Sequence, residues 1–241
     1  MNYTESLERM RSLKLHGMAS ALEGVLEAKQ AQHLTAEQLL ALLLQHEYDE
    51  RHNRKIDRLT QQARFRYMAQ LEQIKPSAKR NLDATQLASL STCNWIAKGE
   101  NLLITGPTGV GKSYLGTAFG NQGCLFGYKV MYYNAQKLFY SLRLAKMDGT
   151  HRKLIAAMAK SDLLIIDDFG LQTLDDTSRM DLMEIIEDRH GNKSTLICSQ
   201  LPVSNWFEII GEPTLADAIM DRLTAHANRI DLKGESQRKS A

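Results

Sequence analysis

The chain has 241 residues, 43% of them hydrophobic, which is enough for one core of ordinary domain size plus a smaller appendage. Its 30 basic and 28 acidic residues leave a formal net charge of +2, so total charge does not point to a polyanionic partner. The three cysteines lie far apart without a C-x-x-C pair, which supports neither a disulfide framework nor a zinc site, and no stretch approaches the roughly 18 apolar residues of a membrane span. We therefore expect a cytoplasmic protein with no membrane partner.

The beginning of the chain has the pattern of helices. From Tyr3 to Lys29 apolar residues recur at mostly three- and four-residue steps, with an interruption around Gly17. Thr35, with Gln38 three residues later, forms a capping-box sequence, and the run from Leu39 to Phe65 contains no proline or glycine. These features predict a small all-α module.

Pro76 and the polar residues after it predict the end of this module. We place the boundary near residues 74 to 82. The prediction is a helical N-terminal module at 1–75, which serves assembly, DNA or partner contacts, and a second domain at 76–241.

Beyond the boundary, short apolar strands alternate with helices. We expect strands at 102–105, 129–133, 163–167 and 195–199, and helices at 112–121, 135–146, 151–160 and 178–189. Alternation at this spacing predicts an α/β fold, with a parallel sheet and helices on both faces.

The stretch Gly106-Pro-Thr-Gly-Val-Gly-Lys-Ser113 has the spacing of a phosphate-binding loop and lies between an expected strand and an expected helix. Its backbone N–H groups and the start of the helix would face phosphate, Lys112 would bind phosphate, and Ser113 would bind magnesium. The alternative is a glycine-rich turn with an incidental lysine. The candidate nucleotide-binding residues are Gly106, Pro107, Thr108, Gly109, Val110, Gly111, Lys112, Ser113 and Tyr114.

A second informative stretch, Leu163-Leu-Ile-Ile-Asp-Asp-Phe-Gly170, reads as a buried strand that ends in two carboxylates. Asp167 would hold the magnesium, and Asp168 would orient or deprotonate an attacking water. Strands also end in a capping aspartate, which is the alternative. The pair of acids favours nucleotide hydrolysis over simple nucleotide binding.

The next expected strand ends in Ser199 and Gln200. Either side chain could hydrogen-bond the γ-phosphate or the attacking water, and Gln200 has the longer reach. The alternative is a strand that simply becomes polar at the surface.

Arg222 lies on an expected amphipathic helix near the end of the domain. An arginine supplied across a subunit interface can stabilise charge on a transferred phosphoryl group. An ion pair with Asp217 or Asp221 of the same chain is the alternative. Arg238 is a weaker candidate for the same ligand, because chain ends are usually mobile.

Arg51, Arg54, Lys55 and Arg58 fall at i, i+3, i+4 and i+7 and so line one stripe of an expected helix. Such a stripe suits the phosphate backbone of DNA and would make binding depend strongly on salt without reading sequence. The alternative is a solvated helix face. Arg152 and Lys153, in a basic part of the second domain, are further candidates for contact with DNA.

Taken together, these motifs resemble the IstB-type helper ATPases of bacterial insertion sequences, which are similar to the DnaC-type helicase loaders and belong to the AAA+ group. The resemblance rests on the phosphate loop and on the segments 164–170, 199–204, 219–223 and 233–236, together with Leu-Lys-Leu-His-Gly-Met-Ala at 13–19, so it spans nearly the whole chain. It implies a P-loop NTPase sheet of the AAA+ type.

The resemblance also implies an activity. Such a protein would use ATP and Mg2+, self-assemble into a homo-oligomer through ATP-bridged interfaces on double-stranded DNA, deform the DNA and present it to a partner transposase of the IstA type. The family's roles, transferred to matching positions, agree with those above, with Arg222 as the finger in trans. Asp168 stands where most AAA+ members have glutamate, which favours slow or DNA-dependent hydrolysis. The few residues after Arg222 predict no helical C-terminal lid, and we expect the N-terminal module to supply subunit contacts instead.

Three other functions are consistent with part of this sequence pattern. A loader of a replicative helicase would have the same ATPase residues and differ in the partner of the N-terminal module. A small-molecule P-loop kinase would need an acceptor pocket and an arginine-bearing lid, and neither is visible in the sequence. A DNA-binding scaffold that uses ATP only for assembly would tolerate Asp168→Asn.

Overall fold

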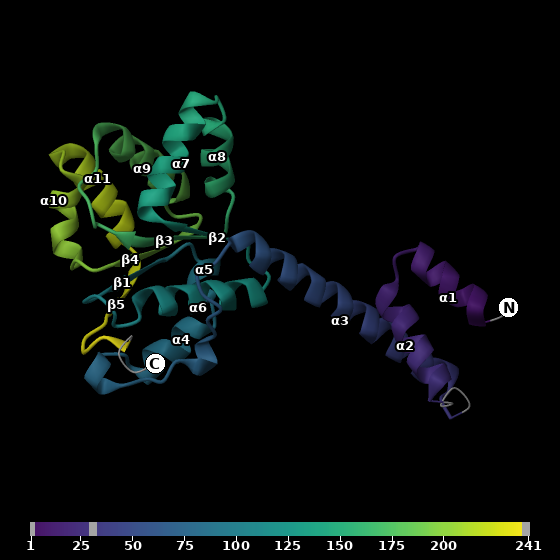
Figure 1. Cartoon of the computed structure of the whole chain (residues 1–241). Coiled ribbons are helices and arrows are strands. Elements are labelled where there is room, and N and C mark those ends of the chain that lie inside the picture. Colours follow the sequence, from purple (N-terminus) through teal and green to yellow (C-terminus); the bar gives the residue numbers. More distant parts are fainter. Residues whose placement is uncertain (1–2, 29–32, 238–241) are drawn as a thin grey trace. The chain divides into compact units, whose positions relative to one another are not determined.

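The computed structural model describes residues 3–28 and 33–237 (Figure 1). The chain forms two compact units, Met1–Arg58 and Leu59–Ala241, which divide inside one long helix. None of the described helices is long and apolar enough to cross a membrane.

The first unit is all helical, as the sequence predicts. It contains α1 (Tyr3–Ser12), α2 (His16–Glu27) and the first part of α3 (Ala36–Ala63). The expected capping box begins α3, because the Thr35 N–H donates to Gln38 Oε1 at 2.9 Å and the Gln38 N–H donates to Thr35 Oγ1 at 3.2 Å. A small apolar core of Ala21, Leu22 and Leu43 joins α2 to α3.

Gly17 and Glu47 explain the interruption in the N-terminal helical pattern. The Glu47 carboxylate accepts hydrogen bonds from the N–H groups of Gly17, at 2.8 Å, and Met18, at 3.2 Å, and so caps the start of α2. A Cβ at Gly17 would lie 2.5 Å from the carbonyl oxygen of His46. The two helices therefore approach closely only because residue 17 has no side chain.

The second unit is built on a five-stranded parallel sheet in the order β2-β3-β4-β1-β5. Alternate residues of the strands enter two separate apolar cores, so Leu102 and Ile104 of β1 face one core and Leu103 faces the other. In Figure 1, α4 and α6 lie on one side of the sheet and α7 to α11 on the other. This arrangement confirms the predicted α/β fold.

The observed bounds agree closely with the expected ones. The strands are β1 (Asn101–Thr105), β2 (Val130–Asn134), β3 (Leu163–Phe169), β4 (Ser194–Ser199) and β5 (Ala227–Asp231). The helices are α4 (Ala84–Ser91), α5 (Asn94–Ala97), α6 (Lys112–Leu125), α7 (Ala135–Met147), α8 (His151–Ala159), α9 (Asp176–Arg189), α10 (Trp206–Ile210) and α11 (Pro213–Thr224), with short 3-10 turns at Leu71–Gln73, Ala78–Arg80 and Val203–Asn205.

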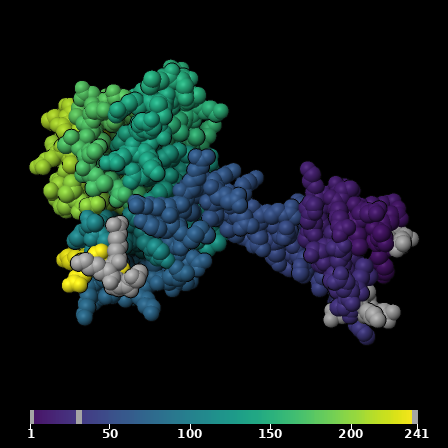
Figure 2. Space-filling model, in the orientation of Figure 1, coloured from purple at the N-terminus to yellow at the C-terminus, as the bar shows by residue number. Residues whose placement is uncertain are grey.

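The sequence did not predict β5. It is an edge strand with one buried residue, Ile230, and it depends on pairing with β1, from Asn101 opposite Ala227 to Thr105 opposite Asp231. After β5, the described chain continues only through residues 232–237, without a helical lid. Figure 2 shows this yellow C-terminal segment on the surface of the second unit, beside blue atoms of the segment that follows α3.

The segment 59–75 packs into the second unit. Leu59 and Ala63, at the end of α3, share a core with Leu71 and Ile74 and with the β1 strand. The division of functions at residues 75 and 76 stays a prediction.

Candidate nucleotide site

The glycine-rich loop lies where parallel α/β sheets bind ligands, between the C-terminal end of β1 and the N-terminus of α6. Gly111 stands just before α6 with a φ of 96°, in the left-handed region that glycine adopts without strain. The turn at this glycine directs the chain into the helix, so the loop's N–H groups and the positive end of α6 are available to an anion.

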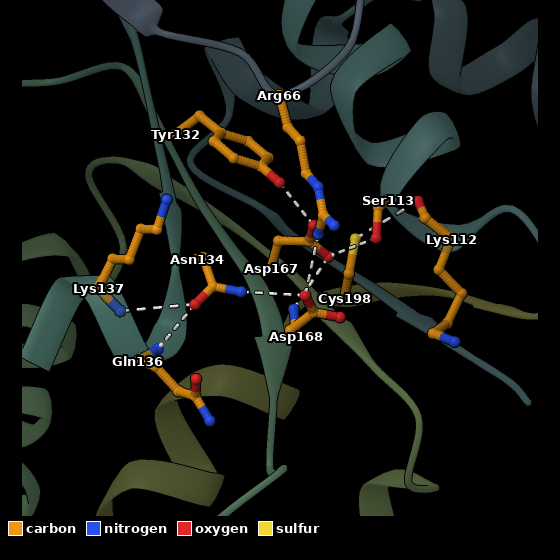
Figure 3. Close-up of polar contacts among 10 residues, drawn as sticks. All are labelled: Arg66, Lys112, Ser113, Tyr132, Asn134, Gln136, Lys137, Asp167, Asp168 and Cys198. Carbon is orange, nitrogen blue, oxygen red and sulfur yellow. Dashed lines mark hydrogen bonds and ion pairs between the residues drawn. The ribbon is translucent and has the colours of Figure 1, made fainter. Parts of the chain in front are cut away.

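Lys112 and Ser113 occupy the first turn of α6 (Figure 3). The Lys112 side chain is buried, and its Nζ donates to the carbonyl oxygen of Pro107 at 2.8 Å. Ser113 Oγ donates to Asp167 Oδ1 at 2.9 Å. This hydrogen bond joins the phosphate loop to the end of β3, so the structure brings together the two motifs that the sequence singled out.

Asp167 is almost completely buried at the end of β3. Besides Ser113, it accepts hydrogen bonds from the Tyr132 hydroxyl, at 2.5 Å, and from the Asp168 N–H, at 2.9 Å. Burial raises the pKa of Asp167 and the Asp168 charge adds to this effect, although the hydrogen bonds from Tyr132 and Ser113 oppose it. A buried carboxylate with a hydroxyl beside it forms a set of oxygen donors of the kind that Mg2+ prefers.

Asp168 lies at an irregularity of β3, where the pairing register with β4 shifts between Ile166 and Phe169. Its φ of 57° is in the left-handed region, which is uncommon for residues other than glycine and is often found at functional sites. One carboxylate oxygen, Oδ2, accepts from Asn134 Nδ2 at 2.9 Å and pairs with Arg66 Nη1 at 3.2 Å.

Sequence reasoning missed Arg66, Tyr132 and Asn134. Tyr132 and Asn134 are on β2, which pairs with β3 so that Asn134 lies opposite Asp167. The sequence did offer a signal for Tyr132 and Asn134, because they are polar residues at the end of an expected strand, as Asp167 and Asp168 are. No local pattern could identify Arg66, which is 102 positions from Asp168.

Ser199 and Gln200 have different surroundings. Ser199 is fully buried; its Oγ donates to the carbonyl oxygen of Phe169 at 2.8 Å and accepts from the Leu201 N–H at 3.1 Å. Gln200 instead contacts the phosphate loop, where its Oε1 accepts from Thr108 Oγ1 at 2.7 Å. Of the two, Gln200 has the side chain that lines the nucleotide cavity.

Arg222 lies at the opposite end of the sheet from the phosphate loop. Its carbonyl oxygen accepts from Asn101 Nδ2, at the start of β1, and its guanidinium pairs with Glu187 of α9 and donates to the Ala218 carbonyl oxygen. The intramolecular partner is therefore Glu187, not Asp217 or Asp221. Arg222 cannot reach the phosphate loop of its own chain from this position, so a catalytic role would need a second subunit. Arg238 lies outside the described residues.

A cavity of about 610 Å³ opens along the phosphate loop. It is lined by Lys112, Ser113 and Tyr114 of α6, by Asp168 and Gln200 at the strand ends, and by residues of the segment after α3, among them Tyr67 and Arg80. The volume is in the range of small-molecule and cofactor sites. A nucleotide that binds the phosphate loop would therefore find a cavity for its other groups.

The predicted DNA stripe lies in the first unit and is exposed along its length. Arg51 and Arg54 each pair with a glutamate four residues earlier, at 2.6 and 2.8 Å. Lys55 and Arg58 take part in no ion pair within the described part of the chain.

Arg152 and Lys153, the other candidate DNA residues, are exposed in the first turn of α8 in the second unit.

The parallel sheet, the phosphate loop and the acidic end of β3 define a P-loop protein of the AAA+ type. The family model described as IstB-like ATP binding protein matches residues 8–241, and the chain belongs to this family.

Relatives agree with this assignment, and a solved structure agrees with the fold. The chain is 42% identical to the insertion sequence ATP-binding protein y4pL of Sinorhizobium fredii, over 98% of this chain and 96% of that one. It is 40% identical to the ATP-binding protein of insertion sequence IS1162 of Pseudomonas fluorescens, over 83% of this chain and 87% of that one. A crystal structure of the DnaC helicase loader shares the fold, with a TM-score of 0.57 and 22% identity over 69% of this chain and 98% of that one.

Proposed function

We propose that this protein is an ATP-hydrolysing helper of transposition. It would bind ATP with Mg2+, assemble on duplex DNA, and deliver that DNA to a partner transposase of the IstA type, with hydrolysis to ADP and phosphate controlling the complex. The hydrogen bond between Ser113 and Asp167 carries the proposal, because it places the phosphate loop and the acidic strand end in one site. Membership of a family of insertion-sequence ATP-binding proteins supports the biological context.

The chemistry assigned to the site follows from its donors. The loop N–H groups and Lys112 would bind the phosphates, and Ser113 and Asp167 would hold Mg2+ through oxygen atoms. Mg2+, when bound, neutralises charge on the β- and γ-phosphates. The two residues fit this ion, since a hydroxyl oxygen and an oxygen of a buried carboxylate lie 2.9 Å apart.

Hydrolysis would depend on Asp168 and Gln200. Asp168 is the carboxylate next to Asp167 that faces the cavity, and it would orient or deprotonate the attacking water. Gln200 contacts the phosphate loop through Thr108 and would sense the γ-phosphate. Ser199, whose hydroxyl is used inside the protein, would act by holding the turn that presents Gln200.

Assembly would complete the site. Arg222 is half-buried near the start of β1, far along the sheet from its own phosphate loop, so it would act as an arginine finger in a neighbouring subunit's site. Breaking its pair with Glu187 would be part of that step. Lys55 and Arg58, which have no ion-pair partner in the described residues, are the members of the basic stripe best suited to contact DNA phosphates.

The test is ATP hydrolysis by the purified protein with and without generic duplex DNA, alongside sizing of the ATP-bound species. DNA-stimulated hydrolysis, ATP-dependent assembly, and loss of both in Lys112→Ala are the expected results. A protein that hydrolyses ATP as a monomer and ignores DNA would contradict the helper function. Capture of a replicative helicase rather than an IstA-type transposase would favour the loader alternative.

A further inference from the structure

Arg80, in the 3-10 turn that precedes α4, lies against the phosphate loop. Its Nη2 donates to the carbonyl oxygen of Val110 at 2.7 Å. The same nitrogen lies 3.0 Å from the position that a Cβ would take at Gly111. A guanidinium therefore touches the outside of the loop at the turn into α6.

This arginine is incompletely paired. Its Nε is buried and has no hydrogen-bond partner among the residues that the structure describes. The guanidinium also takes part in no ion pair there, so no carboxylate neutralises its charge. A buried donor without a partner is costly, and an arginine offers five N–H groups of which Val110 uses one. The Arg80 guanidinium therefore has N–H donors and a positive charge available to bind an anion.

Arg80 also faces the nucleotide cavity, which it lines together with Lys112 and Ser113. The guanidinium fork matches phosphate oxygens better than an ammonium group does, because it can donate two parallel hydrogen bonds. Three cationic residues thus line this cavity: Lys112 from inside the loop, Arg80 from beside it, and Lys75 from the segment before Arg80.

The backbone around Arg80 is held by the segment after β5. The Lys233 N–H donates to the Arg80 carbonyl oxygen at 3.0 Å, and the Gln237 N–H donates to the Gly109 carbonyl oxygen at 2.9 Å. A Cβ at Gly109 would lie 2.2 Å from Ser236 Oγ, so the segment packs directly on the loop. These contacts fix Arg80 beside the phosphate loop in a chain that has no described lid.

We propose that Arg80 is a second cationic contact for the phosphates of the bound nucleotide, placed by the C-terminal segment 233–237. The inference rests on the proposed ATP-binding function and adds a binding residue that lies outside the phosphate loop. The ligand class is a nucleoside di- or triphosphate, since the arginine would donate to phosphate oxygens and not to the base.

The test is the dissociation constant of ATP and of ADP, measured by calorimetry for the full chain and its variants. Arg80→Ala is expected to weaken both by about tenfold or more, the size typical of a lost hydrogen bond to a charged group. Arg80→Lys keeps the charge but not the fork, so its affinity is expected to fall between those of the wild type and Arg80→Ala. Lys79→Ala, which removes an exposed charge from the neighbouring position, is the matched control and should stay within twofold of the wild type.

A purely structural role for Arg80 gives a different pattern. Arg80→Gln retains a donor that can reach Val110 but has no charge. If Arg80 only braces the loop, Arg80→Gln will restore the affinity and the inference is wrong; if it binds phosphate, Arg80→Gln will be as weak as Arg80→Ala. Wild-type protein that fails to bind ATP would overturn the proposed function together with this inference, whereas normal wild-type binding and an unaffected Arg80→Ala would overturn this inference alone.

Discussion

The guanidinium of Arg66 lies 3.2 Å from the carboxylate oxygen Oδ2 of Asp168, the same oxygen that accepts a hydrogen bond from Asn134. Arg66 follows α3 by three residues and Asp168 is next to the last residue of β3, so the pair joins the segment after the long helix to the proposed water-activating carboxylate. While the pair holds, this oxygen is occupied by two donors.

We therefore expect Arg66→Ala to raise the basal rate of ATP hydrolysis. The gain should be about two- to fivefold, because a half-exposed ion pair contributes at most about 1 kcal/mol. Steady-state phosphate release without DNA measures it. Arg64→Ala, which removes a nearby exposed charge that does not contact Asp168, should leave the rate unchanged. An equal or lower rate in Arg66→Ala would show that the pair does not restrain Asp168.

Substitutions of the two neighbouring carboxylates are expected to have different effects, one on ATP hydrolysis and the other on Mg2+-dependent ATP binding. Asp168→Asn should bind Mg–ATP normally but lower kcat by about 10²- to 10⁴-fold, the range of general acid–base effects. Asparagine tolerates the positive φ at this position, so the fold should be kept. Asp167→Asn should instead weaken the Mg2+ dependence of ATP binding. Calorimetry with and without Mg2+, together with single-turnover hydrolysis, distinguishes the two; a normal kcat in Asp168→Asn would favour the scaffold in which ATP serves only assembly.

Gly17→Ala is expected to destabilise the first unit by about 1–3 kcal/mol, the usual effect of forcing extra atoms into a packed contact. The new Cβ would lie 2.5 Å from the His46 carbonyl oxygen, and backbone atoms cannot move aside cheaply. Gly24→Ala is the matched control in the same helix, because nothing lies within 4 Å of its Cβ position. It should stabilise α2 by about 0.5–1 kcal/mol. Thermal unfolding followed by far-ultraviolet circular dichroism compares the two, and equal effects would contradict the close helix approach.

Arg189 is expected to be essential for the stability of the second unit. Its guanidinium is fully buried between α8, α9 and β4, and burial lowers its pKa to about 9, so it is still charged at neutral pH. The acceptors are the carbonyl oxygens of Met158, Ser161 and Ser194 and the hydroxyls of Ser161 and Thr195.

Arg189→Ala would leave these buried acceptors unsatisfied and should reduce the free energy of unfolding by at least about 3 kcal/mol. Urea denaturation measures the loss. Arg229→Ala, on the exposed face of β5, should change it by less than about 0.5 kcal/mol. A similar small effect of both substitutions would mean that Arg189 is not a structural clamp.

Asp162 makes stability depend on pH. Burial alone would raise its pKa, but the hydrogen bonds from Lys193 Nζ, at 2.5 Å, and the Lys129 N–H, at 2.8 Å, outweigh burial and lower the pKa below 3.8. Because the folded state binds the proton less tightly than the unfolded chain, the contribution is complete above pH 3.8 and is lost as the pH falls through the folded-state pKa. Asp162→Asn should be less stable than the wild type at pH 7, and the difference should shrink in acid. A difference that stays constant from pH 7 to acid would contradict this role.

Several features of the fold could be predicted from the sequence because they depend on residues that are close together along the chain. The apolar runs and the helical periods predicted eight of the elements of the second unit closely, and Thr35 with Gln38 predicted the start of α3. By contrast, β5 has little strand character of its own and forms because β1 offers it an edge.

The candidate site divides in the same way. The amino-acid sequence by itself determined the phosphate loop, the paired acids at the end of β3 and the family, because each is a short pattern whose chemistry lies in its own residues. Only the tertiary structure brought Arg66 to Asp168, Tyr132 to Asp167 and Arg80 to the phosphate loop, and it placed Arg222 away from its own loop. These relationships join positions up to 102 residues apart, and a contact at that separation is set by how the strands and helices pack, which no local pattern records.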